Sequence, residues 1–172
     1  MKELIKDVII VLAVVIAVTF FFKPVIVKRT SMLPNLQENN YLITSKQAYK
    51  LFGDPQRGDI IVFPVQTDDG KELYIKRVIG LPGDKIKISD GKLYVNGKEQ
   101  DQSFTMDGYT TGEVSGYTVP DGQLYVMGDN RVYSIDSRDP SVGTVPIKNI
   151  TGKVILRIWP ISEFGTIKQG NT

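Results

Sequence analysis

Apolar and polar positions divide the chain into two regions with different patterns. Near the N-terminus, residues 8–22 read VIIVLAVVIAVTFFF, an uncharged run in which Thr19 is the single polar residue. After residue 30, short runs of β-branched and aromatic residues are bounded by Gly, Pro, Asn and Asp, a pattern typical of strands and turns. The 3.6-residue period of a long amphipathic helix does not stand out in this second region. The pattern therefore predicts one apolar helix followed by a β domain.

The second region contains several predicted strands. Asp90-Gly91 separates the alternating runs KIKI and KLYV, which is a strong signal for a tight hairpin. Residues 96–122 are polar, with scattered Gly and Thr, and we expect a small excursion there, either a solvated connection or a weakly structured insertion. The expected fold class is all-β, with short strands arranged to protect their edges. The predicted strands are residues 41–44, 59–64, 73–79, 85–89, 92–95, 123–127 and 153–158.

The N-terminal run is interpreted as an uncleaved, single-span membrane anchor. Its fifteen residues cover roughly 22 Å as a helix, short of the ~30 Å hydrocarbon core. Lys23 could snorkel to the interface and residues 25–27 could add apolar length, although Pro24 is expected to end or kink the helix. We therefore expect a transmembrane helix over about residues 8–27, within an anchor of residues 1–29, and a separate domain over residues 30–172.

Two other interpretations of this run remain open. A cleaved signal peptide needs a basic start and a short apolar run, and both are present, but residues 20–24 read FFFKP and offer a poor cleavage site. A buried core helix would be unusually apolar for so small a domain. Charge alone does not orient the run, because basic residues flank it on both sides: Lys2, Lys6, Lys23, Lys28 and Arg29.

Composition narrows the possible chemistry. The chain of 172 residues contains no Cys and no His, which excludes disulfides, thiolate or imidazole metal sites, Cys nucleophiles and Ser-His-Asp triads. The 21 Lys and Arg residues nearly balance the 19 Asp and Glu residues, and five of the basic residues precede Thr30. The remainder is close to neutral, which is untypical of a nucleic-acid-binding protein. Any side-chain base in this chain must be Lys, Asp, Glu or Tyr.

A Ser or Thr activated by Lys is the nucleophile chemistry that this composition leaves. The lysine amine has a reference pKa of about 10.4, so the site must lower that pKa by burying the amine. Lys76 fits, because it lies in the apolar strand LYIKRVIG, although an edge-strand lysine that points to water is the ordinary alternative. Ser31, which follows the apolar run in TSMLPN, is the candidate partner, although a Ser before a turn is often a hydrogen-bonding cap.

Residues 127–138, MGDNRVYSIDSR, form a third cluster of polar side chains with a turn-like composition. One interpretation is a solvated charged loop. The other is a hydrogen-bonded scaffold that orients a catalytic group.

Together these segments resemble the bacterial type I signal peptidases, in the single-anchor form of Gram-positive bacteria. The resemblance rests on the N-terminal anchor, on Ser31-Met32-x-Pro34, on residues 74–84 (YIKRVIGLPGD) and on residues 128–138 (GDNRxxSxDSR), in that order. It covers nearly the whole chain, and the last two motifs are long and specific. It implies the signal-peptidase β-fold and a membrane-bound serine endopeptidase. Such an enzyme removes signal peptides from secreted preproteins after small residues at the −3 and −1 positions.

The resemblance also implies roles for individual residues. Ser31 would be the nucleophile, Lys76 the general base, and Ser134 the group that orients the lysine amine. Ser/Lys dyads are a known alternative to the triad, which gives the missing histidine a mechanistic explanation. The residues expected to support the site are Asp129 with its partner Arg77, and Asp136 with Arg138. The residues expected to line shallow apolar substrate pockets are Val27, Met32, Leu36, Tyr74 and Ile75.

The resemblance implies partners and a location as well. The partners would be the signal peptides of secreted preproteins and the lipid bilayer, with no nucleic acid, no metal and no cofactor. The domain after the anchor would be catalytic and would lie on the extracytoplasmic face of the cell membrane. The segment around Trp159 and Phe164 is apolar and aromatic, and it is either ordinary core or a surface that dips into the membrane interface.

Two positions depart from the family's usual pattern. Arg29 stands two residues before Ser31, where the family usually has Gly or Ser, and a bulky cation there could narrow the substrate groove or alter the oxyanion site. Asn35 replaces the usual Thr after Pro34 and is expected to change a local turn hydrogen bond. A non-catalytic relative that assists pilus or surface-protein assembly is the alternative function. A self-cleaving Ser/Lys repressor is a remoter one, because the chain offers no DNA-binding helical domain.

Overall fold

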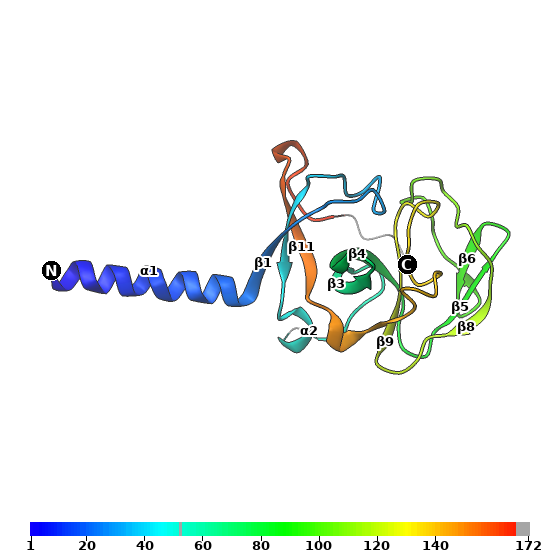
Figure 1. Ribbon diagram of the computed structural model, residues 1–172, viewed down its shortest axis with the longest axis horizontal. Helices are drawn as coiled ribbons and strands as arrows, with labels where there is room; N and C mark the ends of the chain where they lie inside the picture. The colour runs from blue at the N-terminus through cyan, green and yellow to red at the C-terminus, as the bar shows by residue number, and fades with distance from the viewer. Residues whose placement is uncertain (52, 168–172) are drawn as a thin grey trace.

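The protein consists of a β-rich body from which a single long helix projects (Figure 1). The computed structural model describes residues 1–51 and 53–167. Within them the strands form two antiparallel sheets, one of seven strands and one of four. The expected all-β fold class, preceded by one apolar helix, is confirmed.

The N-terminal helix α1 (Lys2–Phe21) has no buried residue. Its 20 residues, with a mean hydropathy of 2.7 over the most apolar 18-residue window, make it long and apolar enough to cross a membrane. A helix of this length spans about 30 Å, which matches the hydrocarbon core without extension past Phe21. The apolar face of α1 therefore has no partner within the described protein, as expected for a helix surrounded by lipid.

The expected helix over residues 8–27 is wrong at both ends. The helix starts at Lys2 and is followed directly by strand β1 (Phe22–Ile26), which pairs along its whole length with β2. Pro24 has no backbone N–H and a fixed φ, which suits an edge strand better than a helix interior. The boundary expected at residue 29 is also displaced, because β1 is already part of the large sheet.

The large sheet supplies the frame of the molecule. Its strand order is β1-β2-β11-β3-β4-β9-β10. The central pair, β3 and β4, joins through a tight turn at Gly70 and stays in register from Ile60↔Arg77 to Thr67↔Gly70. The remaining bounds are β2 (Tyr41–Ser45), β3 (Ile60–Thr67), β4 (Gly70–Gly80), β9 (Gln123–Met127), β10 (Val145–Pro146) and β11 (Gly152–Trp159). Short helices lie between or after them: α2 (Ala48–Leu51), η1 (Ile147–Asn149) and η2 (Ile161–Glu163).

The small sheet accounts for the polar excursion. Its order is β7-β6-β5-β8, built from β5 (Lys85–Ser89), β6 (Lys92–Val95), β7 (Lys98–Glu99) and β8 (Val114–Thr118). The Asp90-Gly91 hairpin forms as predicted, with positive φ at both residues. The expectation of a plain solvated connection for residues 96–122 is wrong. The segment contains β7 and β8, and it buries Thr105 and Thr110.

The apolar core comprises three clusters, and two of them flank the central strands. One contains Phe63, Val78 and Val126, on one side of β3, β4 and β9. Another joins Met32 and Leu36, from the segment after β1, to Val62 and Val154. The third fills the space between the small sheet and the end of β4. The second cluster fixes the segment that carries Ser31 against the large sheet.

Candidate active site

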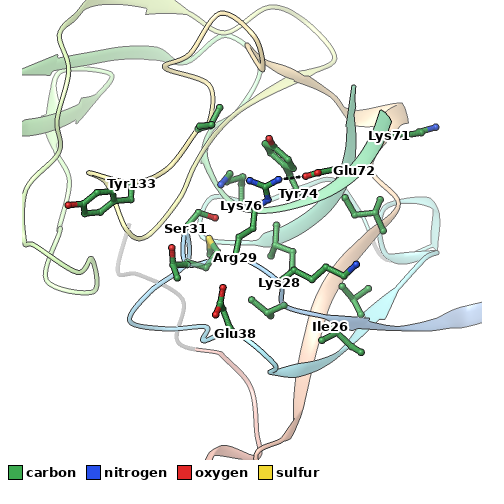
Figure 2. A pocket seen from close by; sticks show the side chains of 17 residues that line it. Ile26, Lys28, Arg29, Ser31, Glu38, Lys71, Glu72, Tyr74, Lys76 and Tyr133 are labelled. Carbon is green, nitrogen blue, oxygen red and sulfur yellow. Dashed lines mark hydrogen bonds and ion pairs between the residues drawn. The ribbon is translucent and has the colours of Figure 1, made fainter. Parts of the chain in front are cut away.

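A groove of about 890 Å³ runs along one edge of β4 (Figure 2). One wall is the segment Val25–Met32, and the other is Lys71–Lys76 of β4. Tyr133 and Ile135, from the third motif, also line it. Ser31 and Lys76 both line this groove, so the fold brings the first two sequence motifs to one place.

Ser31 lies in a loop that closes on itself. Val27 donates to the carbonyl oxygen of Asn40 at 3.0 Å, and Asn39 donates back to that of Val27 at 2.9 Å. Inside this closed loop, the side chain of Met32 is 1% exposed and is anchored in the core. The neighbouring residue Ser31 remains partly exposed at the groove. The burial of Met32 therefore presents the serine toward the groove.

Lys76 occupies the middle of the large sheet. It pairs with Ile61 of β3, and its residue is 3% exposed. Its amine lies 5.4 Å from the centroid of the Tyr74 ring. Tyr74 stands two positions earlier in β4, so its side chain lies on the same face of the strand. The alternative of an edge-strand lysine that points to water is therefore excluded.

The surroundings of Lys76 favour its neutral form. Burial lowers the pKa of the Lys76 amine from 10.5 to about 8, and the positive charges of Arg138 and Arg29 act in the same direction. The negative charges of Asp136 and Asp129 oppose the shift. Near neutral pH a useful fraction of the amine is thus free to accept a proton, which an ordinary surface lysine is not.

The third motif forms a braced loop after β9. Both carboxylate oxygens of Asp136 accept hydrogen bonds from Arg138, Oδ1 from Nε at 2.9 Å and Oδ2 from Nη2 at 2.8 Å. The Gly128 N–H donates to Oδ2 at 2.9 Å. Burial alone would raise the pKa of Asp136, but the hydrogen bonds and the charge of Arg138 outweigh it, so the pKa is lowered. The loop is therefore built on a carboxylate that is ionised at neutral pH.

This loop packs directly against the Ser31 segment. A methyl group on Gly128 would lie 2.3 Å from Ser134 Oγ and 2.4 Å from the Ser31 carbonyl oxygen. Only a glycine allows such close approach. The Ser134 hydroxyl, itself buried, is therefore held next to the backbone of Ser31.

The buried ion pair between Arg77 and Asp129 joins β4 to the same loop. Both side chains are fully buried, and Asp129 accepts from Arg77 Nε at 2.8 Å and Nη2 at 2.7 Å. Asn35 Nδ2 donates to the second carboxylate oxygen at 2.9 Å and to the carbonyl oxygen of Phe104 at 2.8 Å. Asn35 does more than change a local turn bond, because it ties the nucleophile loop to the supporting carboxylate. The expectation of a purely local effect is wrong.

Residues 1–159 match the family model of signal peptidases, peptidase S26. The chain belongs to this family. It is 44% identical over 158 residues to signal peptidase I of Bacillus caldolyticus, with 84% of both chains covered. It is also 34% identical over 186 residues to signal peptidase IB of Staphylococcus aureus strain COL, with 95% of this chain and 94% of that protein covered.

A solved structure is also similar in sequence. It is a signal peptidase I from Enterococcus faecalis V583, 32% identical, and the match covers 58% of this chain and 95% of that one with a TM-score of 0.48. The assignment to the signal peptidase family rests on the sequence matches.

The five residues expected to form apolar substrate pockets do not all line the groove of this signal peptidase-family chain. Val27, Met32, Tyr74 and Ile75 line it, although the first three are mostly buried. Leu36 is fully buried in the core and packs with Leu42 and Val62 instead. The Leu36 N–H donates to the Met32 carbonyl oxygen, so the chain makes one turn between these residues and both side chains enter the same core cluster.

Two residues of the GDNR motif, Asn130 and Arg131, make hydrogen bonds that were not predicted from the sequence. The Asn130 backbone N–H donates to the Ser31 carbonyl oxygen at 3.0 Å, and its side chain donates to that of Thr30 at 3.2 Å. Arg131 is buried, donates to the carbonyl oxygen of Gly128 at 3.0 Å and bonds the hydroxyl of Thr110. The sequence signal was available, because both residues stand inside the GDNR motif, but nothing in their spacing indicated the partners.

Within residues 1–51 and 53–167, no group of three or more Asp or Glu side chains is placed to hold a metal ion. At the site, Glu72, Asp129 and Asp136 form ion pairs with Arg29, Arg77 and Arg138.

Proposed function

We propose that this chain is a membrane-anchored serine endopeptidase that removes signal peptides from secreted preproteins with a Ser31/Lys76 dyad. The observation that carries the proposal is the buried, pKa-lowered Lys76 amine in a groove that also holds Ser31. The family membership supplies the reaction, the absence of His excludes an imidazole base, and the lowered pKa of Lys76 makes it the base that we propose at the groove.

The proton path follows from these positions. Neutral Lys76 accepts the proton of Ser31 Oγ while the oxygen attacks the scissile carbonyl carbon. The tetrahedral intermediate collapses, the peptide C–N bond breaks, and the Lys76 ammonium gives its proton to the leaving amine. Water then attacks the acyl-enzyme with Lys76 again as the base, which restores the Ser31 hydroxyl. We expect Ser134 to orient the amine for these transfers, and the Ser31 backbone N–H to be a donor for the oxyanion.

The exposed edge of β4 suits an extended substrate. The pairing between β4 and β9 starts at Arg77↔Met127, so residues 71–76 face the groove on that side. A peptide can add there as a strand, with alternate side chains pointing into the wall. Val27 and Met32 lie on the opposite wall and Tyr74 lies on this one, and shallow pockets between them would favour small residues at the −1 and −3 positions.

Membrane anchoring by α1 places the groove close to its substrates. The helix passes into β1, and the Lys46 amine donates to the Thr19 carbonyl oxygen at 2.6 Å, so the helix end is tied to the sheet. Signal peptides are themselves apolar and membrane-bound. We place the body of the enzyme on the extracytoplasmic face, where cleavage of a translocated preprotein takes place.

A cleavage assay tests the proposal. The full-length chain in liposomes is given a fluorogenic peptide with an Ala-x-Ala site, and the wild type is expected to cut after the second Ala. Ser31→Ala and Lys76→Ala are each expected to reduce kcat by at least about 10³-fold. The exposed Lys148→Ala variant controls for loss of a lysine and should retain the wild-type rate.

Mass spectrometry of the same enzyme and substrate distinguishes the protease from the non-catalytic alternative. Intact-mass analysis of the wild type with a slowly hydrolysed substrate should detect an acyl group on Ser31. Binding of the peptide without any cleavage or acyl-enzyme would favour a role in assembling surface proteins. Undiminished cleavage by Lys76→Ala would show that another group is the base.

A further inference from the structure

Arg29 occupies an unusual place in the groove. It stands two residues before Ser31, and its side chain is held across the groove by an ion pair with Glu72 of β4. Figure 2 shows Arg29 reaching from the Ser31 side toward Glu72 and passing beside Lys76. Glu72, Tyr74 and Lys76 share one face of β4, because side chains two residues apart point the same way.

The Tyr74 ring brings Arg29 and Lys76 together. The Arg29 guanidinium carbon lies 5.7 Å from the ring centroid, and the Lys76 amine lies 5.4 Å from it. The two cations can therefore be no further apart than the sum of these distances. Tyr74 is buried, so the space between the two groups is poorly screened by water on that side.

The other charges around Lys76 are already paired with each other. From the loop after β9, Asp136 attracts the ammonium form and Arg138 repels it, but these two residues form an ion pair of their own. Asp129 also attracts it, and Asp129 is paired with Arg77. Lys28 and Glu38 also line the groove, but Arg29 is the residue whose charged group lies over the Tyr74 ring beside the amine. Its own partner Glu72 lies on the far side from the amine (Figure 2).

We infer that Arg29 is a positioning residue for the dyad: its guanidinium, held over the Tyr74 ring by Glu72, disfavours a positive charge on Lys76 and so keeps the base ready to take the Ser31 proton. This inference rests on the proposed Ser31/Lys76 mechanism. On this view, an arginine at residue 29, where the family usually has a small residue, helps the reaction.

The test is the pH dependence of kcat/KM for a charge series at residue 29. Arg29→Gln is expected to move the midpoint of the acid limb upward by about half a pH unit, a modest shift because Arg29 is half exposed to solvent. At pH 7 this lowers kcat/KM about three-fold, while the rates near pH 9.5 converge. Arg29→Glu should move the midpoint further, and Arg29→Lys should keep it near the wild-type value.

Lys28→Gln is the matched control. It removes the same charge from the adjacent residue, but the Lys28 side chain points along the groove away from Lys76 (Figure 2), so the midpoint should not move. Midpoints that are identical in wild type, Arg29→Gln and Arg29→Glu, with changes in KM alone, would overturn the inference and leave Arg29 a steric element of the groove. Failure of the dyad itself is a separate result, seen as full activity of Lys76→Ala.

Discussion

The backbone N–H of Asn130 donates a hydrogen bond to the Ser31 carbonyl oxygen at 3.0 Å. This contact fixes the nucleophile segment to the loop after β9, which is far from it in sequence. Gly128 lies where this loop meets the Ser31 segment. A Cβ atom added to Gly128 would point at Ser134 Oγ and at the Ser31 carbonyl oxygen. The position of Ser31 is therefore set by the loop as much as by its own turn.

Gly128→Ala is expected to push the Ser31 segment and the loop after β9 apart. The added methyl group would lie within 2.4 Å of backbone and side-chain oxygens, so either Ser31 or Ser134 must shift. A displacement of about 1 Å at a reacting atom can cost ~100-fold in rate, and we expect at least that loss in kcat. The measurement is single-turnover cleavage by protein shown to be folded by circular dichroism.

Gly152→Ala is the matched control for crowding. Its methyl group would meet Thr44 Oγ1 at 2.9 Å, between β2 and β11 and away from the groove. We expect a lower melting temperature with kcat of the folded protein unchanged. A Gly128→Ala enzyme with wild-type kcat would contradict the importance of the contact between this loop and the Ser31 segment.

The pH profile of the wild type reports the general base. The pKa of Lys76 is about 8, and the neutral amine is the active form. The rate constant kcat/KM should therefore rise about ten-fold per pH unit below pH 8 and level off above it. Stopped assays from pH 5.5 to 9.5 with an uncharged-flank peptide would measure it. A profile that is flat over this range would exclude an amine as the base.

Lys76→Met is expected to stabilise the protein while it abolishes cleavage. Below about pH 8 the folded chain buries a charged amine, which disfavours folding, and the pKa lowered from 10.5 to about 8 corresponds to a cost of about 3 kcal/mol. This net cost already includes the attraction to Asp136 and Asp129. We expect about 1–3 kcal/mol of added stability at pH 7 in urea unfolding.

The sign of the pH effect gives a second check on this variant. Between pH 8 and 10.5 the unfolded wild type binds the lysine proton and the folded wild type does not, so wild-type stability rises with pH there. The advantage of Lys76→Met should then shrink as the pH rises. Lys148→Met, at an exposed position, should show neither effect. A Lys76→Met protein less stable than wild type at pH 7 would contradict the argument.

Alternation and turn residues were enough to predict strands in both sheets. The predicted strands at residues 85–89, 92–95 and 123–127 have the observed bounds, and the Asp90-Gly91 hairpin forms where expected. Among the strands that were missed, β1 was assigned to the end of the apolar helix, β7 and β10 have two residues each, and β8 is polar. β8, for example, contains Gly116 and has hardly any buried side chain, so its pairing depends on β5 more than on its own sequence.

The site could be predicted only as a set of motifs. Local sequence placed Lys76 in a strand, but its burial depends on β3 and on Tyr74, which no local pattern reveals. Similarly, Asn35 reads as a turn residue, whereas its amide bonds Asp129 across the molecule. Burial and long-range hydrogen bonding are properties of the assembled sheet, so they lie beyond periodicity and propensity.

Asp129→Asn is expected to destabilise the protein strongly. Arg77 and Asp129 are both fully buried, and removing one charge leaves the other without full compensation. Such losses cost about 3–5 kcal/mol, measured as a lower urea midpoint. The exposed pair Lys92–Glu99 is the control, because Glu99→Gln should change stability by less than about 1 kcal/mol. Equal effects of the two variants would contradict the structural role of the buried pair.

Contact between the end of β11 and the bilayer can be tested with the protein's own fluorophore. Trp159 is the one Trp of the chain; its residue is 52% exposed, and nearby Ile161 and Phe164 are 72% and 62% exposed. Large apolar side chains gathered at a surface favour burial in a membrane interface. In liposomes containing brominated lipid, we expect quenching of Trp159 fluorescence, and weaker quenching in an Ile161→Ser, Phe164→Ser variant. Emission that is the same with brominated and unbrominated lipid would show that this surface stays in water, and α1 would then be the membrane contact that remains.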